Sequence, residues 1–249
     1  MRLHTAKFEL DKLVLVYITD VHYGSKYCDK ELFKENLEWC LETPNVYVID
    51  GGDLMETATR DSVGAGVFEQ DEITQKQLED VIALYKPLAE KGRLLGLHRG
   101  NHEFRVFKHS GTNLTKIAAK MLGVNYFGDG VLHYLKVGKE NYTLYTCHGH
   151  SGAKLPHTKI KSALDLANMV DVEVYVAGHV HQLSHHTRIF YRIDKKNKQV
   201  VEGHKHFVLG GSYLDHWGSY GQMQGYEMMR KGSPKIKLHG DEHIVRVSL

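Results

Sequence analysis

The pattern of apolar positions predicts buried strands in the first half of the chain. Three short runs of mainly Val, Leu and Ile lack polar alternation, which is typical of strands covered on both faces. These runs lie at 13–18, 46–49 and 94–97. Residues 58–70 instead predict a loop, which contains Gly64 and Gly66.

Apolar residues at helical spacing predict four amphipathic helices. In the segment 29–42 these residues are Leu32, Phe33, Leu37 and Cys40. The pattern and the proline placement predict a second helix at about 72–91. The remaining two helices are expected at 114–122, where Gly123 ends the helix, and near 158–169.

Strands dominate from residue 131 onward. Residues 131–137 and 142–147 predict a hairpin around Gly138, and 172–177 is another buried run. Two alternating strands at about 184–193 and 199–209 flank a polar turn, and 244–247 closes the tail. A βαβαβ opening followed by a β-rich half predicts one α/β domain, spanning 1–249, in which two sheets pack face to face with helices outside.

Composition sets few limits on function. The 249 residues are 42% apolar and 25% charged with a net charge of +2, which neither requires nor excludes nucleic acid as a partner. Three cysteines without a CxxC pair argue against a disulfide framework and fit a reducing compartment. No apolar run is long enough for a secretory signal or a membrane span. We therefore expect a soluble cytoplasmic protein without a membrane partner.

Five short polar motifs each follow an apolar run. They are Asp20-Val21-His22, Gly51-Gly52-Asp53, Gly100-Asn101-His102-Glu103, His148-Gly149-His150 and Gly178-His179-Val180-His181. Because α/β sheets place ligands beyond the carboxyl ends of their strands, the five loops can converge on one crevice. Each motif alone reads equally well as a turn, a helix cap or a core histidine, and with 18 histidines a single HxH pair carries little weight. As an ordered set, the motifs predict a site for two divalent cations.

The residue types within the motifs suit this chemistry. An extended backbone would point Asp20 and His22, two residues apart, the same way. Asp53 follows two glycines that permit a tight turn, and its two carboxylate oxygens can bridge two cations, which an imidazole cannot do. Asn101 offers an amide oxygen, whereas His102 is expected to point the other way, toward a substrate.

This set of motifs resembles the calcineurin-like metallophosphoesterase superfamily, whose pattern is D-x-H, G-D, G-N-H-[DE], H and G-H-x-H. The match runs from residue 20 to residue 181. The resemblance implies a four-layer αββα sandwich of two mixed β-sheets, with two metals at one edge. It also implies a metal-dependent phosphoric ester hydrolase, in which a metal-bridging hydroxide attacks the phosphate.

The resemblance also implies a role for each matching position. Three residues would hold the first metal: Asp20, His22 and His181. Three others would hold the second: Asn101, His148 and His179. Asp53 would bridge the two metals, and His102 would serve as general acid or transition-state stabiliser, so these two count as catalytic. Glu103 or Asp50 could orient the ring of His102 or one of the metal ligands.

The metals and the substrate are less closely defined. Oxygen and imidazole ligands without thiolate suit Mn²⁺, Fe or Zn²⁺, with Ni²⁺ and Mg²⁺ as further choices, and manganese is expected to support activity in vitro. The expected substrate is a phosphodiester or nucleotide, and a nucleic acid remains an alternative. A metal-dependent DNA or RNA nuclease is therefore the nearest rival function. A non-catalytic scaffold, such as the retromer subunit with a similar fold, is disfavoured because the implied ligand set is whole.

Departures from the family pattern argue against some subgroups of the superfamily. Asp53 is followed by Leu54-Met55-Glu56, and not by the continuation G-D-x-x-D-R-G of the protein Ser/Thr phosphatases. Purple acid phosphatases have Tyr, and DNA-repair exonucleases have His, at the position that Glu56 occupies here. This departure argues against a purple ferric site and weakens a nuclease assignment.

Further residues are weaker candidates for substrate contacts. Arg105, with Lys108, could bind a second phosphate or a nucleic-acid backbone, and His150 lies near His148 in the sequence. Three lysines fit an exposed helix face better than a binding surface: Lys154, Lys159 and Lys161. Four aromatic residues could stack on a base but fit core burial better: Tyr213, Trp217, Tyr220 and Tyr226.

Overall fold

A computed structural model describes residues 2–60, 62 and 66–249. The predicted loop 58–70 is therefore described only in part, and Gly64 lies outside the described residues. Gly66 opens a short 3₁₀ turn, η1 (Gly66–Glu69).

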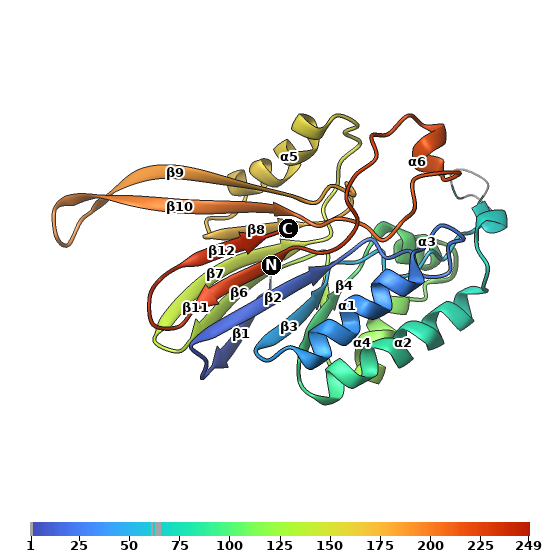
Figure 1. Ribbon diagram of the computed structural model, residues 1–249, viewed down its shortest axis with the longest axis horizontal. Helices are drawn as coiled ribbons and strands as arrows, with labels where there is room; N and C mark the ends of the chain where they lie inside the picture. The colour runs from blue at the N-terminus through green and yellow to red at the C-terminus, as the bar shows by residue number, and fades with distance from the viewer. Residues whose placement is uncertain (1, 61, 63–65) are drawn as a thin grey trace.

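Two mixed six-stranded sheets form the centre of the described structure (Figure 1). Sheet A has the order β1-β6-β7-β8-β10-β9. Its strands are β1 (Leu3–Phe8), β6 (Gly130–Val137), β7 (Glu140–Cys147), β8 (Val174–Ala177), β9 (Ser184–Asp194) and β10 (Gln199–Leu209). Sheet B has the order β12-β11-β2-β3-β4-β5. Its strands are β2 (Lys12–Ile18), β3 (Val46–Asp50), β4 (Leu94–His98), β5 (Asn125–Gly128), β11 (Lys235–His239) and β12 (Val245–Ser248).

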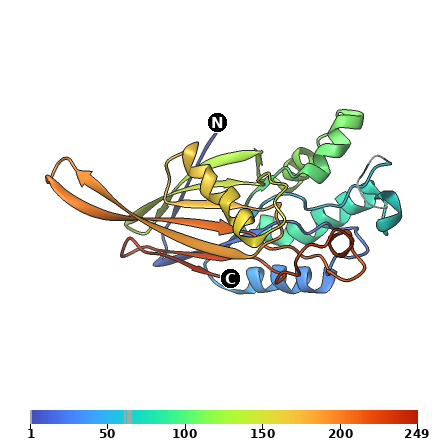
Figure 2. The same cartoon turned by 90° about the horizontal axis from the view of Figure 1, so that it is seen from above.

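Helices cover the outer face of each sheet. Sheet B is covered by α1 (Lys30–Glu42), α2 (Thr74–Glu90) and α4 (Leu114–Leu122), and α3 (Asn101–Ser110) packs against α4. Sheet A is covered by α5 (Pro156–Asp165), followed by the turn η2 (Leu166–Asn168). A short helix, α6 (Tyr220–Met223), lies in the segment between β10 and β11. Figure 1 shows α5 above the strands and α1 below them, and in Figure 2, seen from above, the yellow helix α5 lies over the strands. The expected αββα layering is therefore confirmed.

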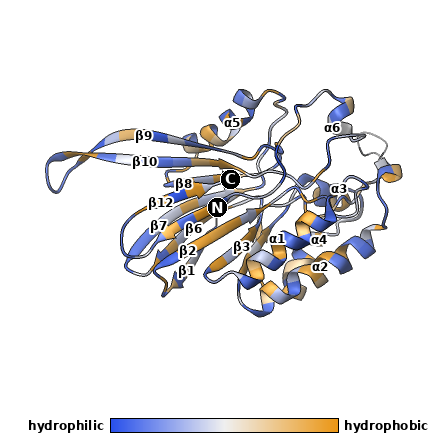
Figure 3. Cartoon of the chain, viewed as in Figure 1, coloured by the Kyte–Doolittle hydropathy of each residue, from blue (hydrophilic) through white to orange (hydrophobic). Residues whose placement is uncertain are grey.

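Strand periodicity explains how one strand serves two interior layers. On β2, the side chains of Val14, Val16 and Ile18 join the cluster between sheet B and its helices. The alternate residues Leu13, Leu15 and Tyr17 join the cluster between the two sheets. Successive side chains on a strand point to opposite faces, so an uninterrupted apolar run fills both layers. Figure 3 shows the same contrast, with β2 largely hydrophobic and α1 banded.

A third apolar layer lies between sheet A and α5. Its buried members include Tyr175 and Phe207 on the sheet and Ala163 on the helix. Beyond this layer, the β9–β10 hairpin extends well past the other strands (Figure 1). The hairpin carries exposed apolar side chains at Ile189, Tyr191, Ile193 and Val200.

The elements predicted from the sequence are present, with ends shifted by a few residues. The hairpin around Gly138 is the antiparallel pair β6–β7. The strands β1, β5 and β11 and the helices α3 and α6 were not predicted. Within the described residues, no helix combines the length and apolar character that a bilayer span requires.

Candidate metal centre

The five motifs lie together where strands of both sheets end. Asp20 follows β2, Asp53 follows β3, and Asn101 opens α3 just beyond β4. His148 follows β7, and His179 follows β8. Backbone hydrogen bonds tie neighbouring loops to one another: Asp20 N–H donates to Gly52 O (3.0 Å), and Gly178 N–H donates to His148 O (2.9 Å). The sheets therefore bring together residues that are far apart in the sequence.

The backbone at the motifs is not extended. Asp20 and His22 both have left-handed dihedrals, with φ of 54° and 53°. The expectation that strand geometry orients this pair is therefore wrong. The same conformation recurs at Asp53 (φ 50°), His179 (φ 70°) and His181 (φ 52°).

One group of ligand atoms gathers around Asp20. His181 Nε2 lies 3.1 Å from Asp20 Oδ1 and 3.3 Å from His22 Nε2. The other oxygen, Asp20 Oδ2, accepts hydrogen bonds from Thr19 Oγ1 (2.7 Å) and from His179 N–H (2.8 Å). Asp20 Oδ1 is buried and has no hydrogen-bond donor among the described residues. A buried carboxylate oxygen without a donor, beside two imidazole nitrogens, is suited to a cation.

A second group gathers around Asn101. Its Oδ1 lies 3.0 Å from His148 Nε2 and 2.8 Å from His179 Nδ1. His148 Nδ1–H donates to Gly51 O (2.9 Å), which leaves Nε2 directed at Asn101 and at Asp53 Oδ2, 3.3 Å away. This group offers an amide oxygen, a carboxylate oxygen and two imidazole nitrogens.

Asp53 lies between the two groups. It forms one possible metal-binding set with His148 and His179 and another with His22 and His102, while Asp20, His22 and His181 form a third. Within each set the ligand atoms lie within 4.8 Å of one another. Asp53 Oδ1 accepts from His102 N–H (2.8 Å), which fixes the carboxylate.

Two glycines allow the backbone to approach the carboxylates. A Cβ at Gly100 would lie 2.0 Å from Asp53 Oδ1, and a Cβ at Gly178 would lie 2.1 Å from Thr19 Oγ1 and 2.8 Å from Asp20 Oδ2. Any side chain at these positions would displace the carboxylates, which explains the glycine that opens each of these motifs.

The charges of the site favour ionised carboxylates. Burial disfavours the charge on Asp20, but His181 outweighs it and lowers the pKa to about 2. The pKa of Asp53 is also lowered, because His148 and His102 outweigh its burial. The same pairing raises the pKa of His148 to about 10. Burial lowers the pKa of His22 and of His179, so both rings are neutral at neutral pH and each offers a lone pair.

Glu56 is a site residue whose role the sequence did not reveal. Its Oε2 lies 3.1 Å from His22 Nδ1 and 3.4 Å from His102 Nδ1, and its carbonyl oxygen lies 3.0 Å from His102 Nδ1. Bonding at Nδ1 leaves Nε2 of His22 to face His181. The signal was present, because the departure from the family pattern falls at this position.

His102 opens the neighbouring helix and borders the same atoms. Burial opposes a charge on its ring, but Asp53 and Glu56 outweigh the burial and raise its pKa. Its Nε2 lies 3.8 Å from Asp53 Oδ2. The ring therefore lies next to the ligand atoms, and it also lines a pocket of about 470 Å³.

Glu103 and Asp50 accept hydrogen bonds from backbone N–H groups and from a tyrosine hydroxyl, and not from the proposed ligand side chains. Glu103 accepts from Met55 N–H (2.9 Å) and from Gly100 N–H (3.0 Å). Asp50 accepts from Gly52 N–H (3.0 Å) and from Tyr85 Oη–H (2.9 Å), and burial raises its pKa to about 8. Both acids shape the turns that carry Asp53 and Asn101.

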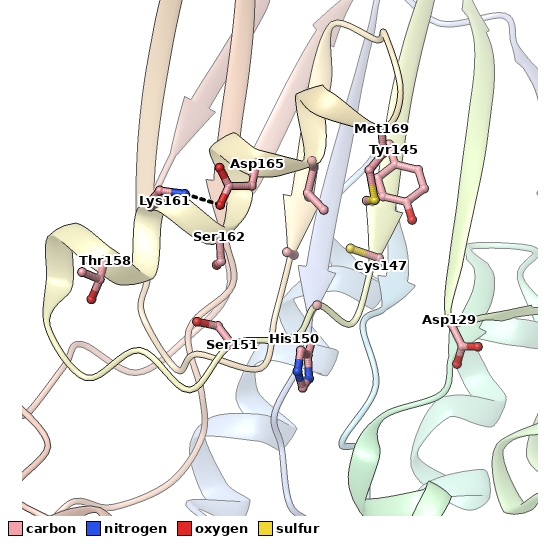
Figure 4. Close-up of a pocket in the computed structure, with 13 residues that line it drawn as sticks. Asp129, Tyr145, Cys147, His150, Ser151, Thr158, Lys161, Ser162, Asp165 and Met169 are labelled. Carbon is pink, nitrogen blue, oxygen red and sulfur yellow. Dashed lines mark hydrogen bonds and ion pairs between the residues drawn. The ribbon is translucent and has the colours of Figure 1, made fainter.

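The weaker candidates lie in different surroundings. Arg105 lines the same pocket as His102, but it already donates to Ser62 Oγ (2.7 Å) and lies 3.8 Å from Glu56 Oε1. His150 stacks on His179, with ring centroids 6.0 Å apart, and it borders a separate pocket of about 580 Å³ beside α5 (Figure 4).

The aromatic candidates also differ in their surroundings. Tyr213 is buried in the core, as expected, whereas Trp217 is 71% exposed. Tyr226 is half-buried and lines the pocket beside His102. The side chain of Tyr220 lies outside the described structure.

Comparisons with known proteins found no matching family model and no matching curated protein. Among solved structures, Vacuolar Protein Sorting 29 from Cryptosporidium parvum is 18% identical, with 95% of this chain and 97% of that chain covered and a TM-score of 0.46. A predicted phosphoesterase from Streptococcus pneumoniae is 12% identical, with coverage of 95% and 97% and a TM-score of 0.41. A metallophosphoesterase from Sphaerobacter thermophilus is 14% identical, with coverage of 94% and 86% and a TM-score of 0.40.

Two face-to-face sheets with flanking helices thus carry five polar motifs, in the expected order, at one edge. In its fold and in the order of these motifs, the chain resembles the calcineurin-like metallophosphoesterase superfamily.

Proposed function

We propose that this chain is a metal-dependent phosphoric ester hydrolase that prefers phosphodiesters or nucleotides. One observation carries the proposal. Two buried carboxylates, Asp20 and Asp53, lie among imidazole nitrogens and an amide oxygen, and Asp53 is shared between the neighbouring sets. This mixture of donors suits divalent cations such as Mn²⁺, Fe²⁺ or Zn²⁺.

The proposed ligands divide between two cations. The first would be held by Asp20, His22 and His181. The second would be held by Asn101, His148 and His179. Asp53 would contribute to both. When bound, two such cations neutralise charge on phosphoryl oxygens and lower the pKa of a bound water toward about 7.

The chain's own part in the reaction centres on His102. Its Nδ1–H is directed at the carbonyl oxygen of Glu56, so the proton on Nε2 is the one available to a substrate. Asp53 and Glu56 raise the pKa of His102, which favours the protonated ring. His102 would therefore donate a hydrogen bond or the proton to the leaving oxygen, a contribution of roughly 10²–10⁴-fold.

The proposal is tested by pairing metal content with turnover. We expect Asp53→Asn to lose bound Mn²⁺ and activity together, because it removes a charge shared by both sets. His102→Ala should retain the metal and lose roughly 10²–10⁴-fold in kcat. His186→Ala, at an exposed position on β9, is the matched control and should change neither. Metal is measured by equilibrium dialysis.

The substrate panel defines the class of ester. It compares bis-4-nitrophenyl phosphate, 4-nitrophenyl phosphate, cyclic nucleotides and single-stranded DNA, each with added Mn²⁺. Degradation of oligonucleotides that falls steeply with salt would identify a nuclease. Failure on every ester, by a protein that has bound its metal, would refute the hydrolase and leave a scaffold.

A further inference from the structure

A pocket of about 470 Å³ opens beside the proposed metal ligands. Four residues of the site are part of its lining: His22, Asn101, His102 and His181. The rest of the wall includes Lys159 of α5 and parts of the segment 212–229. Pockets of this size hold ligands as large as a nucleotide, so the lining residues outside the proposed ligand set can contact the remainder of a substrate.

Lys159 is an unusual component of this wall. Its side chain is only 5% exposed, and among the described residues no carboxylate oxygen lies within 4.0 Å of its ammonium group. Its ammonium group lies over the ring of Tyr226, whose centroid is 5.8 Å from Nζ. Glu227 acts on Lys159 electrostatically from an exposed position. A buried ammonium without a close counter-ion is costly, and burial accordingly lowers its pKa.

The other cations of this pocket have different surroundings. Arg105 is held by Ser62 and Glu56, and Lys108 lies exposed over the ring of Phe104. Lys161, on the same helix as Lys159, is exposed, pairs with Asp165 (2.6 Å) and borders the other pocket (Figure 4). The expectation of an exposed basic helix face is thus confirmed for Lys161 and wrong for Lys159.

We propose that Lys159 binds a second anionic group, a phosphate or a carboxylate, on the same molecule whose phosphoester lies at the metal ligands. This inference rests on the proposed function. An ammonium donates charge-assisted hydrogen bonds to either anion, and in a buried pocket these are strong. The preferred substrate therefore carries an anion in addition to the ester that is cleaved.

Binding is measured first, by calorimetry without added metal, so that nothing is cleaved during the titration. Adenosine 3′,5′-bisphosphate should bind the wild type about 10- to 100-fold more tightly than adenosine 5′-monophosphate. Lys159→Met should abolish this advantage, Lys159→Arg should restore much of it, and Lys161→Met should leave it intact. A carboxylate is tested in the same way with 3-phosphoglycerate against glycerol 1-phosphate, and the pair with the larger advantage identifies the anion.

Turnover is measured next on two esters with the same leaving group. These are thymidine 5′-(4-nitrophenyl phosphate) with and without a 3′-phosphate. The ratio of their kcat/KM values should fall about 10- to 100-fold in Lys159→Met and stay unchanged in Lys161→Met. The ester without the second phosphate should be cleaved equally by the wild type and by Lys161→Met, whose altered residue borders the other pocket.

The outcomes separate this inference from the proposed function. If no ester is cleaved but the binding advantage depends on Lys159, the hydrolase fails and the anion site stands. If no anion pair shows an advantage in the wild type, or if Lys159→Met keeps it, the anion site is refuted. Lys159→Met should also melt at the same or a higher temperature, because it removes a buried charge. A lower melting temperature would identify a structural role and count against the proposal.

Discussion

Five residues of the proposed centre have the left-handed backbone conformation, which few residues other than glycine adopt. They are Asp20, His22, Asp53, His179 and His181. The conformation costs roughly 1–2 kcal/mol per residue. Strain of this kind persists where the surrounding structure holds it in place, and it is common at functional sites. The left-handed conformation therefore lowers the stability of the fold, and it directs these side chains toward the proposed metal centre.

The strain predicts an unusual response to a glycine substitution. His181→Gly should leave the unfolding free energy in EDTA unchanged or raise it by up to about 1 kcal/mol, because relief of strain outweighs the extra freedom of the unfolded chain. The side chain is 35% exposed, so little packing is lost. The stabilisation by added Mn²⁺ should fall in the same variant. Both quantities are measured by urea denaturation.

His186→Gly provides the comparison, since His186 lies on the strand β9 with an exposed side chain. Glycine there should cost roughly 0.5–1 kcal/mol. An equal loss of stability in His181→Gly would contradict the strain argument.

At this scale the sequence predicted which residues come together but not how they are oriented. The order of the motifs identified the seven ligand candidates, whereas the left-handed turns follow from contacts between loops. Lys159 had a detectable signal, because it lies four residues before the buried Ala163 and seven before Leu166 on one helical face. Its charge made an exposed position the natural expectation.

Among the secondary-structure elements, α3 matters most for the site. Its first residues are Asn101 and His102, and its third is Glu103, which is buried and joins Gly100 to Met55. Because the helix has no continuous apolar stripe, the pattern of apolar positions did not predict it. The strand β11 was detectable, since Ile236 and Leu238 alternate with polar residues. The strands β1 and β5 lie at sheet edges and have mostly exposed or half-buried residues, so their apolar patterns are weak.

Removing the acid at the start of α3 tests how firmly the helix is held. Glu103→Ala should destabilise the chain by about 1–3 kcal/mol for each buried N–H that loses its acceptor, at Met55 and at Gly100. Glu103→Gln retains an acceptor and should recover much of the loss. Urea denaturation measures both variants, and dialysis against Mn²⁺ should show weaker binding in Glu103→Ala. Equal stability of wild type and Glu103→Ala would refute this role for Glu103.

In the molecule as a whole, a polar chain crosses the apolar layer between the two sheets. His98 on β4 bonds Gly128 O (3.1 Å) with Nδ1 and Thr146 Oγ1 on β7 (2.8 Å) with Nε2. Thr146 also bonds His133 Nε2 (2.7 Å), whose Nδ1 lies 3.0 Å from His4 Nδ1. One neutral tautomer of each ring satisfies every bond in this chain. Its members lie on strands that are distant in the sequence, so no local pattern could predict it.

This buried chain predicts a loss of stability in acid. Burial lowers the pKa of His98 to about 3 and lowers that of His133 as well, whereas in the unfolded chain both titrate near about 6.5. Below about pH 6.5 the unfolded state binds more protons, so the unfolding free energy falls as the pH drops toward about 3. The slope is up to about 1.4 kcal/mol per pH unit for each ring.

The measurement is urea denaturation at pH 7.5, 6.0 and 5.0. The variant His98→Gln/His133→Gln should show a flatter dependence than the wild type, because it removes both titrating rings. His186→Gln should match the wild-type slope. Identical slopes in the wild type and the double variant would show that these rings do not titrate on unfolding.

The placement of β11 beside β2 has a consequence for synthesis. Residue 181 completes the set of proposed ligands, but β2, which ends just before Asp20, pairs on one side with residues 235–239. A nascent chain that has left the ribosome as far as residue 181 therefore contains every proposed ligand. At that stage the strand that precedes Asp20, β2, still lacks its partner β11 on one side. We therefore expect binding of the proposed metals to follow the pairing of β11 with β2. A truncation before residue 235 should weaken metal binding, although β11 and β12 contribute none of the proposed ligands.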